Sequence, residues 1–257
     1  MPLLFRHAHR LAVSAATVLV LAAPAAAQTR PRPLKPTRVT VSVSVGAQAA
    51  ASNLSEHFSL DKNLETQTVD VTYPKKAGVL VDVGAGYRLW KNLGVGVAVS
   101  RTSDNGSAQV DARIPHPFFF NQPRTITGQE SGIVHAETGV HIQVQYLVPS
   151  STHFHVVLSA GPSWLKVEQE AVTGVIVTES YPYDTASFGG AVTKLLNTSG
   201  PGYHAGADLT WMFSRNAGVG GLVRYTHANV DLNVAEGRTI GIKAGGVQGG
   251  IGIRFKF

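Results

Sequence analysis

The stretch Ile251-Gly252-Ile253-Arg254-Phe255-Lys256-Phe257 alternates large apolar side chains with small or basic ones. Successive side chains of a β-strand point to opposite faces, so one face of this segment is apolar and the other carries Gly252, Arg254 and Lys256. A strand of a soluble protein shows the same alternation. The meaning of the segment therefore depends on the rest of the chain.

Residues 1–27 have the parts of an export signal. Arg6 and Arg10 precede the apolar run 11–23, and Ala25-Ala26-Ala27 is the small-residue site after which we expect cleavage. The proline-rich, basic residues 28–38 predict an extended periplasmic tail. No later stretch approaches the ~20 apolar residues of a transmembrane helix. The sequence contains no cysteine, which excludes a disulfide framework.

The composition indicates an all-β chain. It includes 27 glycines among 257 residues, and no sustained apolar spacing of three and four residues predicts helices. The formal net charge of +6 is not gathered into a Lys/Arg cluster with interleaved aromatic residues. We therefore expect no nucleic-acid partner.

Eight segments alternate with a period of two, and an even strand number is what single-chain bacterial barrels require. Their connections alternate in length: 91–92, 149–152 and 214–217 are short, whereas 48–78, 102–133, 165–202 and the shorter 231–241 are long. We expect an all-β, eight-stranded antiparallel up-and-down transmembrane β-barrel over 39–257, with short periplasmic turns and long extracellular loops. The predicted strands are 39–47, 79–90, 93–101, 134–148, 154–164, 203–213, 219–230 and 242–257.

The two faces of these segments differ in composition. One is rich in Val, Leu, Ile and aromatic residues, whereas the other is mostly Gly, Ser, Ala and Thr with a few charges. A water-exposed exterior would carry many Lys and Glu, so the small-residue face fits the narrow lumen that eight strands enclose. A charge at the bilayer midplane costs ~2–4 kcal/mol for Arg or Lys and less for acids, which places the charged residues inside.

Aromatic residues on the apolar face cluster near both ends of the predicted strands. This distribution is typical of the two interfacial girdles of a membrane barrel, although core aromatics of a soluble barrel are the alternative. The expected membrane girdle comprises Tyr87, Tyr146, Phe154, Trp164, Tyr203, Trp211, Phe213, Phe255 and Phe257.

The chain resembles the small eight-stranded bacterial outer-membrane barrels, the group of the OmpA transmembrane domain, OmpX, OmpW and the opacity-type proteins. This resemblance rests on the signal, the strand count, the alternation of turns and loops and the final strand. The resemblance covers essentially the whole mature chain. It implies an outer-membrane location, outer-membrane lipid as a partner and a monomer. It also implies that Ile253, Phe255 and Phe257 are read by the insertion machinery. No peptidoglycan-binding domain follows, unlike in full-length OmpA.

The lumen-facing charges predict a network that plugs the barrel. A turn centred on Asn216 would place Asp208 directly opposite Arg224 as an ion pair. A narrow ion path or gate is the alternative function for the same residues. The predicted lumen charge network comprises Asp82, Glu137, His141, Asp208, Arg224 and Arg254.

No spacing in the chain identifies a metal site or a catalytic site. His135, Glu137 and His141 share a face, but strand positions two apart are ~6.5–7 Å apart, and no third ligand is implied. We expect no metal and no cofactor. Some outer-membrane barrels are lipid-modifying enzymes or proteases, yet no spacing joins the loop-end residues into a triad. Those residues are His204, His227, Ser180, Ser187 and Asp184.

The long connections are the expected seat of specific function. Phe118, Phe119 and Phe120 lie between prolines, and they either close the barrel mouth as a lid or form an exposed patch for a partner, a lipid or an apolar ligand. Residues 66–73 and 172–177 also alternate and predict strand extensions that form a protruding sheet. We expect a structural or surface-interaction barrel, with a conduit for small apolar molecules or ions as the alternative.

Overall fold

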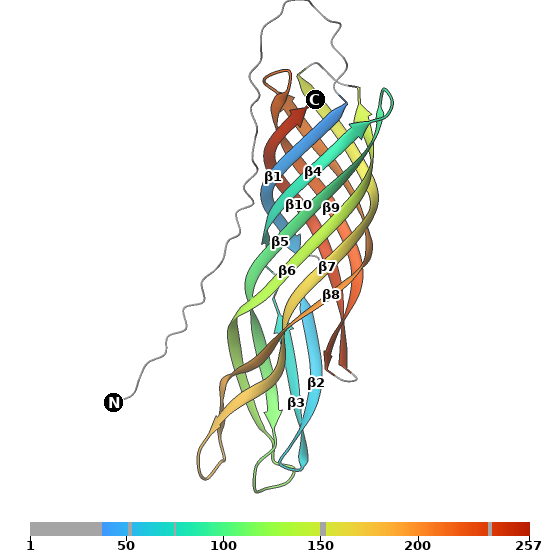
Figure 1. Ribbon diagram of the computed structural model, residues 1–257. Coiled ribbons are helices and arrows are strands. Elements are labelled where there is room, and N and C mark those ends of the chain that lie inside the picture. Colours follow the sequence, from blue (N-terminus) through green and yellow to red (C-terminus); the bar gives the residue numbers. More distant parts are fainter. Residues whose placement is uncertain (1–37, 51–52, 75, 150–152, 236–237) are drawn as a thin grey trace, which may run out of the picture. The chain divides into compact units, whose positions relative to one another are not determined.

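Antiparallel strands make up most of the described part of the computed structural model (Figure 1). It describes residues 38–257 apart from 51–52, 75, 150–152 and 236–237. The expected signal 1–27, residues 28–37 of the expected tail and most of the predicted turn 149–152 therefore lie outside the described residues. The described strands are β1 (Val39–Ala50), β2 (Leu54–Lys62), β3 (Glu65–Tyr73), β4 (Gly78–Arg88), β5 (Leu93–Ile114), β6 (Arg124–Val148), β7 (Phe154–Glu179), β8 (Ala186–Met212), β9 (Ala217–Ala235) and β10 (Arg238–Lys256).

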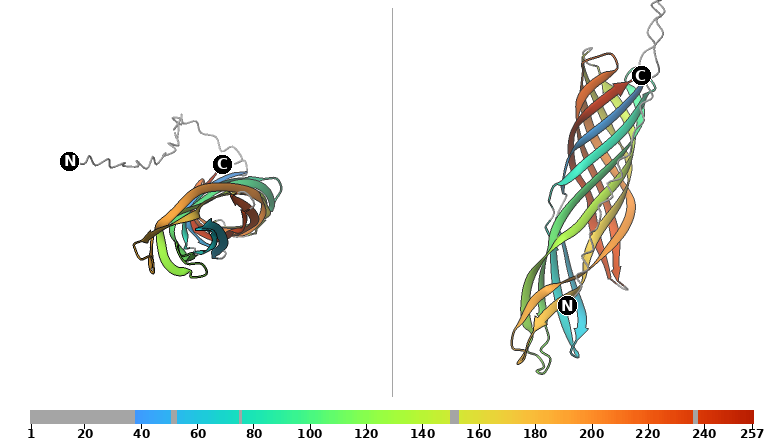
Figure 2. Two further views of the ribbon diagram at one scale, coloured as in Figure 1. Left: turned by 90° about the horizontal axis from the view of Figure 1, so that it is seen from below. Right: turned by 60° about the vertical axis from the view of Figure 1, so that its left-hand side comes forward.

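Eight of these strands close into a ring, which confirms the predicted barrel. The strand order runs β5-β4-β1-β10-β9-β8-β7-β6, and β6 pairs back onto β5. The end-on view in Figure 2 shows the ring. The closing pair of β1 and β10 runs from Thr40 opposite Lys256 to Ala50 opposite Gly246, as expected for the last segment of the sequence. The described residues contain no helix long and apolar enough to cross a membrane.

The expectation that 102–133 and 165–202 are long loops is wrong. β5 and β6 remain paired as far as Ile114 and Arg124, and β7 and β8 remain paired as far as Glu179 and Ala186. Period-2 alternation continues through these segments, but its polarity changes. Beyond the barrel the side chains that point inward are apolar. A prediction that requires small or polar inward side chains therefore ends each strand too early.

Residues 48–78 hold a hairpin outside the ring, formed by β2 and β3. The prediction that 66–73 extends the following strand is wrong, because β3 is a separate strand. It pairs with the far half of β5, from Thr68 opposite Arg113 to Thr72 opposite Gln109. The near half of β5 pairs with β4. The hairpin thus continues the wall where β4 is absent, while residues 172–177 lie in β7 as expected.

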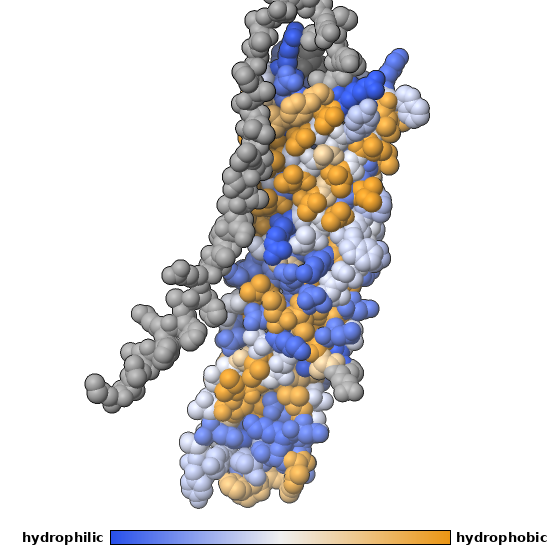
Figure 3. Space-filling model, in the orientation of Figure 1, coloured by the Kyte–Doolittle hydropathy of each residue, from blue (hydrophilic) through white to orange (hydrophobic). Residues whose placement is uncertain are grey.

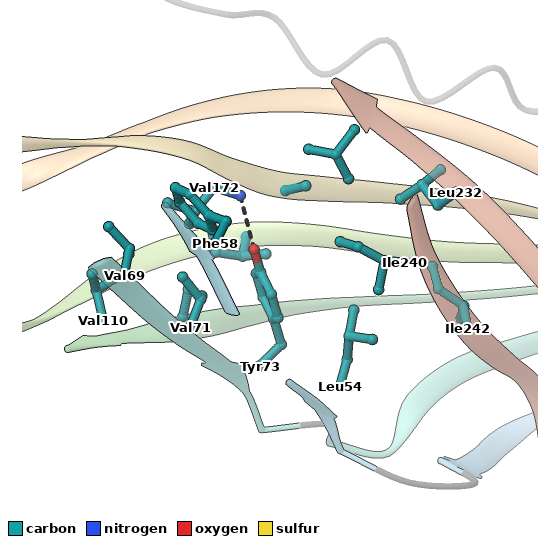
Figure 4. Close-up of a cluster of buried hydrophobic side chains, with 14 of the residues drawn as sticks. Leu54, Phe58, Val69, Val71, Tyr73, Val110, Val172, Leu232, Ile240 and Ile242 are labelled. Atoms are coloured by element: carbon teal, nitrogen blue, oxygen red, sulfur yellow. Dashed lines mark hydrogen bonds between the residues drawn. The ribbon is translucent and has the colours of Figure 1, made fainter. Parts of the chain in front are cut away.

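We call the part beyond the barrel the extension: it consists of β2, β3 and residues 104–114, 124–136, 166–179, 186–199, 228–235 and 238–244. Its interior is a packed apolar core that includes Phe58, Val69, Val172 and Leu232 (Figure 4). Tyr73 crosses this core, and its hydroxyl oxygen accepts a hydrogen bond of 2.8 Å from the backbone N–H of Val172. The extension is therefore filled by side chains.

The outer surface of the ring carries a broad band of exposed aliphatic side chains, including Val97, Ile142 and Ile253. Figure 3 shows apolar residues gathered on the half of the visible face toward the C-terminus. Burial of apolar surface is worth about 25 cal/mol per Å². A contiguous exposed apolar band therefore indicates a surface that contacts another apolar phase or partner. The barrel surface therefore has the character of a membrane-facing wall.

Candidate functional site

Two ion pairs lie inside the ring, and their partners differ from those expected. Arg224 on β9 pairs with Asp82 on β4, across the lumen. Arg254 on β10 pairs with Asp208 on β8, with 2.9 Å between Nε and Oδ2. The expected Asp208–Arg224 pair is wrong because the β8–β9 register places Gly206, not Asp208, opposite Arg224.

The Asp82–Arg224 pair is deeply buried, with 4% and 1% of the side chains exposed. Removing both charges from water is costly, so such a pair persists only when further hydrogen bonds satisfy its remaining atoms. Arg224 Nε supplies one of them to Gln248 Oε1, over 2.7 Å. The guanidinium is thus held by side chains of two strands, β4 and β10, and β10 is the strand next to its own.

A chain of hydrogen bonds continues from this pair toward the extension. Gln248 donates to Gln48 Oε1 over 2.6 Å, and Gln48 donates to Glu137 Oε2 over 2.7 Å. The backbone N–H of Gly245 donates to the same carboxylate oxygen. His135 contacts Glu137 Oε1 at 3.1 Å. Charged and amide side chains from β1, β4, β6, β9 and β10 therefore form one connected group that crosses the lumen.

His141 belongs to a second group, in which imidazole rings and hydroxyl groups alternate. Its Nε2 lies 2.9 Å from Ser100 Oγ, and its Nδ1 lies 2.8 Å from Ser163 Oγ. Ser163 in turn contacts His204 Nδ1 at 2.9 Å. Both imidazoles are buried. This row of alternating hydroxyls and imidazoles crosses from β5 to β8 beside the ion pair.

The residues that sequence reasoning missed are neutral and lie near predicted strand ends. Gln48 and Thr102 fell one residue beyond strands predicted to end at 47 and 101, and Gln169 fell inside a predicted loop. Thr102 donates to Gln48, and Gln169 contacts His135. The continued alternation of the sequence was the signal that could have found them.

The expected girdle residues lie on the outward surface of the ring. All nine side chains are exposed, and their exposed fractions range from 38% for Phe255 to 63% for Phe257. Trp164 stands opposite Val140 across β6 and β7, in the apolar band. Directly beyond that row, Arg101 and Lys166 face outward and both contact Glu168. The change from tryptophan and valine to charged side chains marks one edge of the band.

The three phenylalanines lie at the far end of the extension and not at a barrel mouth. Phe118, Phe119 and Phe120 are 66%, 53% and 65% exposed in the connection between β5 and β6. Leu64 and Tyr181, in the two neighbouring connections, are 94% and 83% exposed. We call these five side chains the distal tip.

Polar contacts tie the three connections of the distal tip together. Asn63 donates to the carbonyl oxygen of Pro115. Arg124 donates to the carbonyl oxygens of Pro115 and Tyr183, over 2.9 and 2.8 Å. The rings of Phe118 and Tyr183 meet edge to face, 5.5 Å apart. The exposed apolar side chains are therefore presented by a braced support.

The candidate catalytic residues do not share one face. His204 points into the lumen, whereas His227 faces outward beside Tyr203 and Tyr225. Ser187 donates to the backbone of β7, and Asp184 lies 3.9 Å from His116 near the distal tip. Within the described residues, no group of three or more His, Asp or Glu side chains has the geometry of a metal site.

Comparison with solved structures identifies the class of fold. The outer membrane protein OprG from Pseudomonas aeruginosa has a similar structure, with a TM-score of 0.51 and 10% identity over 86% of this chain and 96% of that chain. Neisserial surface protein A gives a TM-score of 0.46 and 12% identity over 85% and 97%. No family model and no curated protein matches the sequence. The fold is that of the small eight-stranded outer-membrane β-barrels.

Proposed function

We propose that the chain is an outer-membrane barrel that is closed to solutes and presents the distal tip to an apolar partner outside the cell. The exposed apolar band and its aromatic residues support insertion of the ring into a bilayer. The short turns then face the periplasm and the extension faces outward. In this arrangement Ile253, Phe255 and Phe257, exposed on the closing strand, are available to the insertion machinery and to outer-membrane lipid.

Two features support a closed lumen. The Asp82–Arg224 pair joins β4 to β9, and its amide partners on β10 and β1 carry the network on to Glu137 on β6. Beyond them, the apolar core of the extension fills the interior with residues such as Leu232 and Ile240. A solute would have to break a buried ion pair and then displace a packed core, and each step is costly.

The observation that carries the proposal is the exposure of the distal tip. Five large apolar side chains from three separate connections stand in solvent at the end of the molecule farthest from the band. Buried contacts brace them, so they do not fold back onto the core. Exposed apolar clusters of this kind mark interaction sites.

The test is attachment of Gram-negative cells that display the full chain to an apolar polystyrene surface. We expect these cells to attach more than cells without the chain, and the variant Phe118→Ser/Phe119→Ser/Phe120→Ser to lose most of that gain. Leu195→Ser removes an equally exposed apolar side chain from β8, away from the distal tip, and should retain it. Equal attachment by the triple variant and the parent, at equal surface expression, would reject the proposal.

A conduit for small apolar molecules or ions is the second candidate. The apolar inner surface of the extension favours it, because such a surface binds apolar solutes once its side chains move apart. Conductance and uptake by the refolded chain separate this candidate from the closed barrel.

A further inference from the structure

The half of the lumen on the short-turn side contains a cavity of about 260 Å³. Asp82 and Arg224 form its floor, and Arg38, Arg88 and Lys256 lie around the end where the chain termini of the ring meet. The cavity is separate from the distal tip, and the surface role proposed above does not use it.

Small side chains on two neighbouring strands create the space. Gly84 and Gly86 on β4 and Ala98 on β5 line this wall, and the amide of Gln145 reaches across it. A Cβ atom added at Gly86 would lie 2.5 Å from Gln145 Oε1. A larger residue at this position therefore projects into the cavity, and only the end of a flexible side chain has to move.

The charge of the lining is strongly one-sided. Six cationic side chains and two carboxylates line the cavity. Both carboxylates are already engaged, Asp82 by Arg224 and Asp208 by Arg254. The other four cations, Arg38, Arg88, Arg215 and Lys256, add positive charge at the short-turn end. A main-chain carboxylate at Phe257 would offset one of these positive charges and leave an excess of three.

Concave walls of low dielectric focus such a field and concentrate counter-ions inside. Lysine and arginine donors are the ligands that phosphate and carboxylate groups prefer. A water occupies about 30 Å³ of liquid, so the cavity has room for a molecule of several heavy atoms but not for a polymer. The basic residues 28–37 carry the same sign of charge as the cavity and do not complement it.

We propose that this cavity is a binding site for a small multivalent anion, of phosphate or polycarboxylate chemistry, that enters from the short-turn side. The cations at the mouth attract the anion, while the side-chain amides of Gln143 and Gln145 supply neutral hydrogen-bonding groups in the cavity wall. The Asp82–Arg224 pair closes the far side, so the anion binds without crossing the barrel.

Isothermal titration of the refolded full chain in lipid nanodiscs, at low salt, tests the site with pyrophosphate and with citrate. We expect saturable binding of at least one probe, weakened at least tenfold by Arg88→Gln/Lys256→Gln and by raising the salt. Gly86→Leu keeps every charge and should also lose binding, because it fills the cavity.

The matched control is Arg101→Gln/Lys166→Gln, which removes two positive charges from the outer surface. It should bind the probes as the parent does. Equal weakening in the control, or no saturable binding by the parent at millimolar probe, would overturn the proposal. Circular dichroism confirms that each variant is folded before titration. The attachment assay tests the distal tip, so its failure would reject the surface role without affecting the titration result.

Discussion

At the residue scale, the two lumenal ion pairs differ in how many other side chains they are connected to by hydrogen bonds. Arg224 is held by Asp82 and Gln248, and Gln248 connects it to Gln48 and Glu137. Arg254 and Asp208 pair nearer the short turns, where Thr210 donates to the same carboxylate. A change at Arg224 therefore disturbs a longer network than a change at Arg254.

Arg224→Ala should lower the thermal midpoint of the refolded barrel clearly. The change leaves the Asp82 carboxylate buried without its cation, which typically costs about 3–5 kcal/mol. Arg101→Ala is the control, because Arg101 and Glu168 are 57% and 27% exposed and such pairs contribute about 0–1 kcal/mol. An unchanged midpoint in Arg224→Ala would contradict the role of the network.

Glu56 on β2 predicts a pH effect in the extension. Burial raises the pKa of its carboxyl above the usual range, and the hydrogen bond and charge of Arg238 only partly oppose this. A raised folded-state pKa gives stability that is present below the unfolded-state pKa and is lost as pH rises through the folded-state pKa. The parent should therefore gain thermal stability relative to Glu56→Gln as pH falls from 7 to 4. A relative loss over that range would show that the Arg238 ion pair dominates.

At the element scale, one hydrogen bond across the core joins the β2–β3 hairpin to β7. The Tyr73 hydroxyl accepts the N–H of Val172 on β7, and burial raises the pKa of Tyr73 to about 12, so it stays neutral in ordinary buffers. The contact joins the hairpin to a strand of the ring on the other side of the core (Figure 4).

Tyr73→Phe should leave the Val172 N–H buried without an acceptor, at a cost of about 1–3 kcal/mol. Faster hydrogen exchange at the Val172 amide would report this loss locally. Tyr181→Phe removes a hydroxyl from an exposed ring and should leave that exchange unchanged. Equal protection of Val172 in parent and Tyr73→Phe would show that another group replaces the acceptor.

The sequence predicted the eight ring strands, their order and the closing pair, because period-2 alternation with small inward residues is a local property. Apart from residues 172–177 of β7, it did not predict the hairpin or the added length of β5 to β10, since the inward side chains become apolar beyond the band. Partners across the lumen, such as Asp82 for Arg224, depend on barrel shear and register. The turn between β8 and β9 is centred one residue earlier than expected, so Gly206 and not Asp208 lies opposite Arg224.

At the scale of the whole molecule, the closed lumen that we propose rests on two separate features, the polar network and the core of the extension. The refolded chain should therefore give no stable openings in a planar bilayer, and Arg224→Ala should remain silent because the core still blocks the path. Single-channel recording with a known porin as the positive control checks this. Stable openings in the parent would favour the conduit.

The seam between β1 and β10 constrains how the barrel assembles. Gln48 and Gln248 meet across it although 200 positions separate them in the chain. The entropic cost of joining distant segments grows slowly with length, by about 0.6 kcal/mol per doubling, but none of it is repaid until the intervening strands are in place. We therefore expect closure of this seam to come late in folding, and until then both seam strands expose unpaired backbone groups to any competing strand.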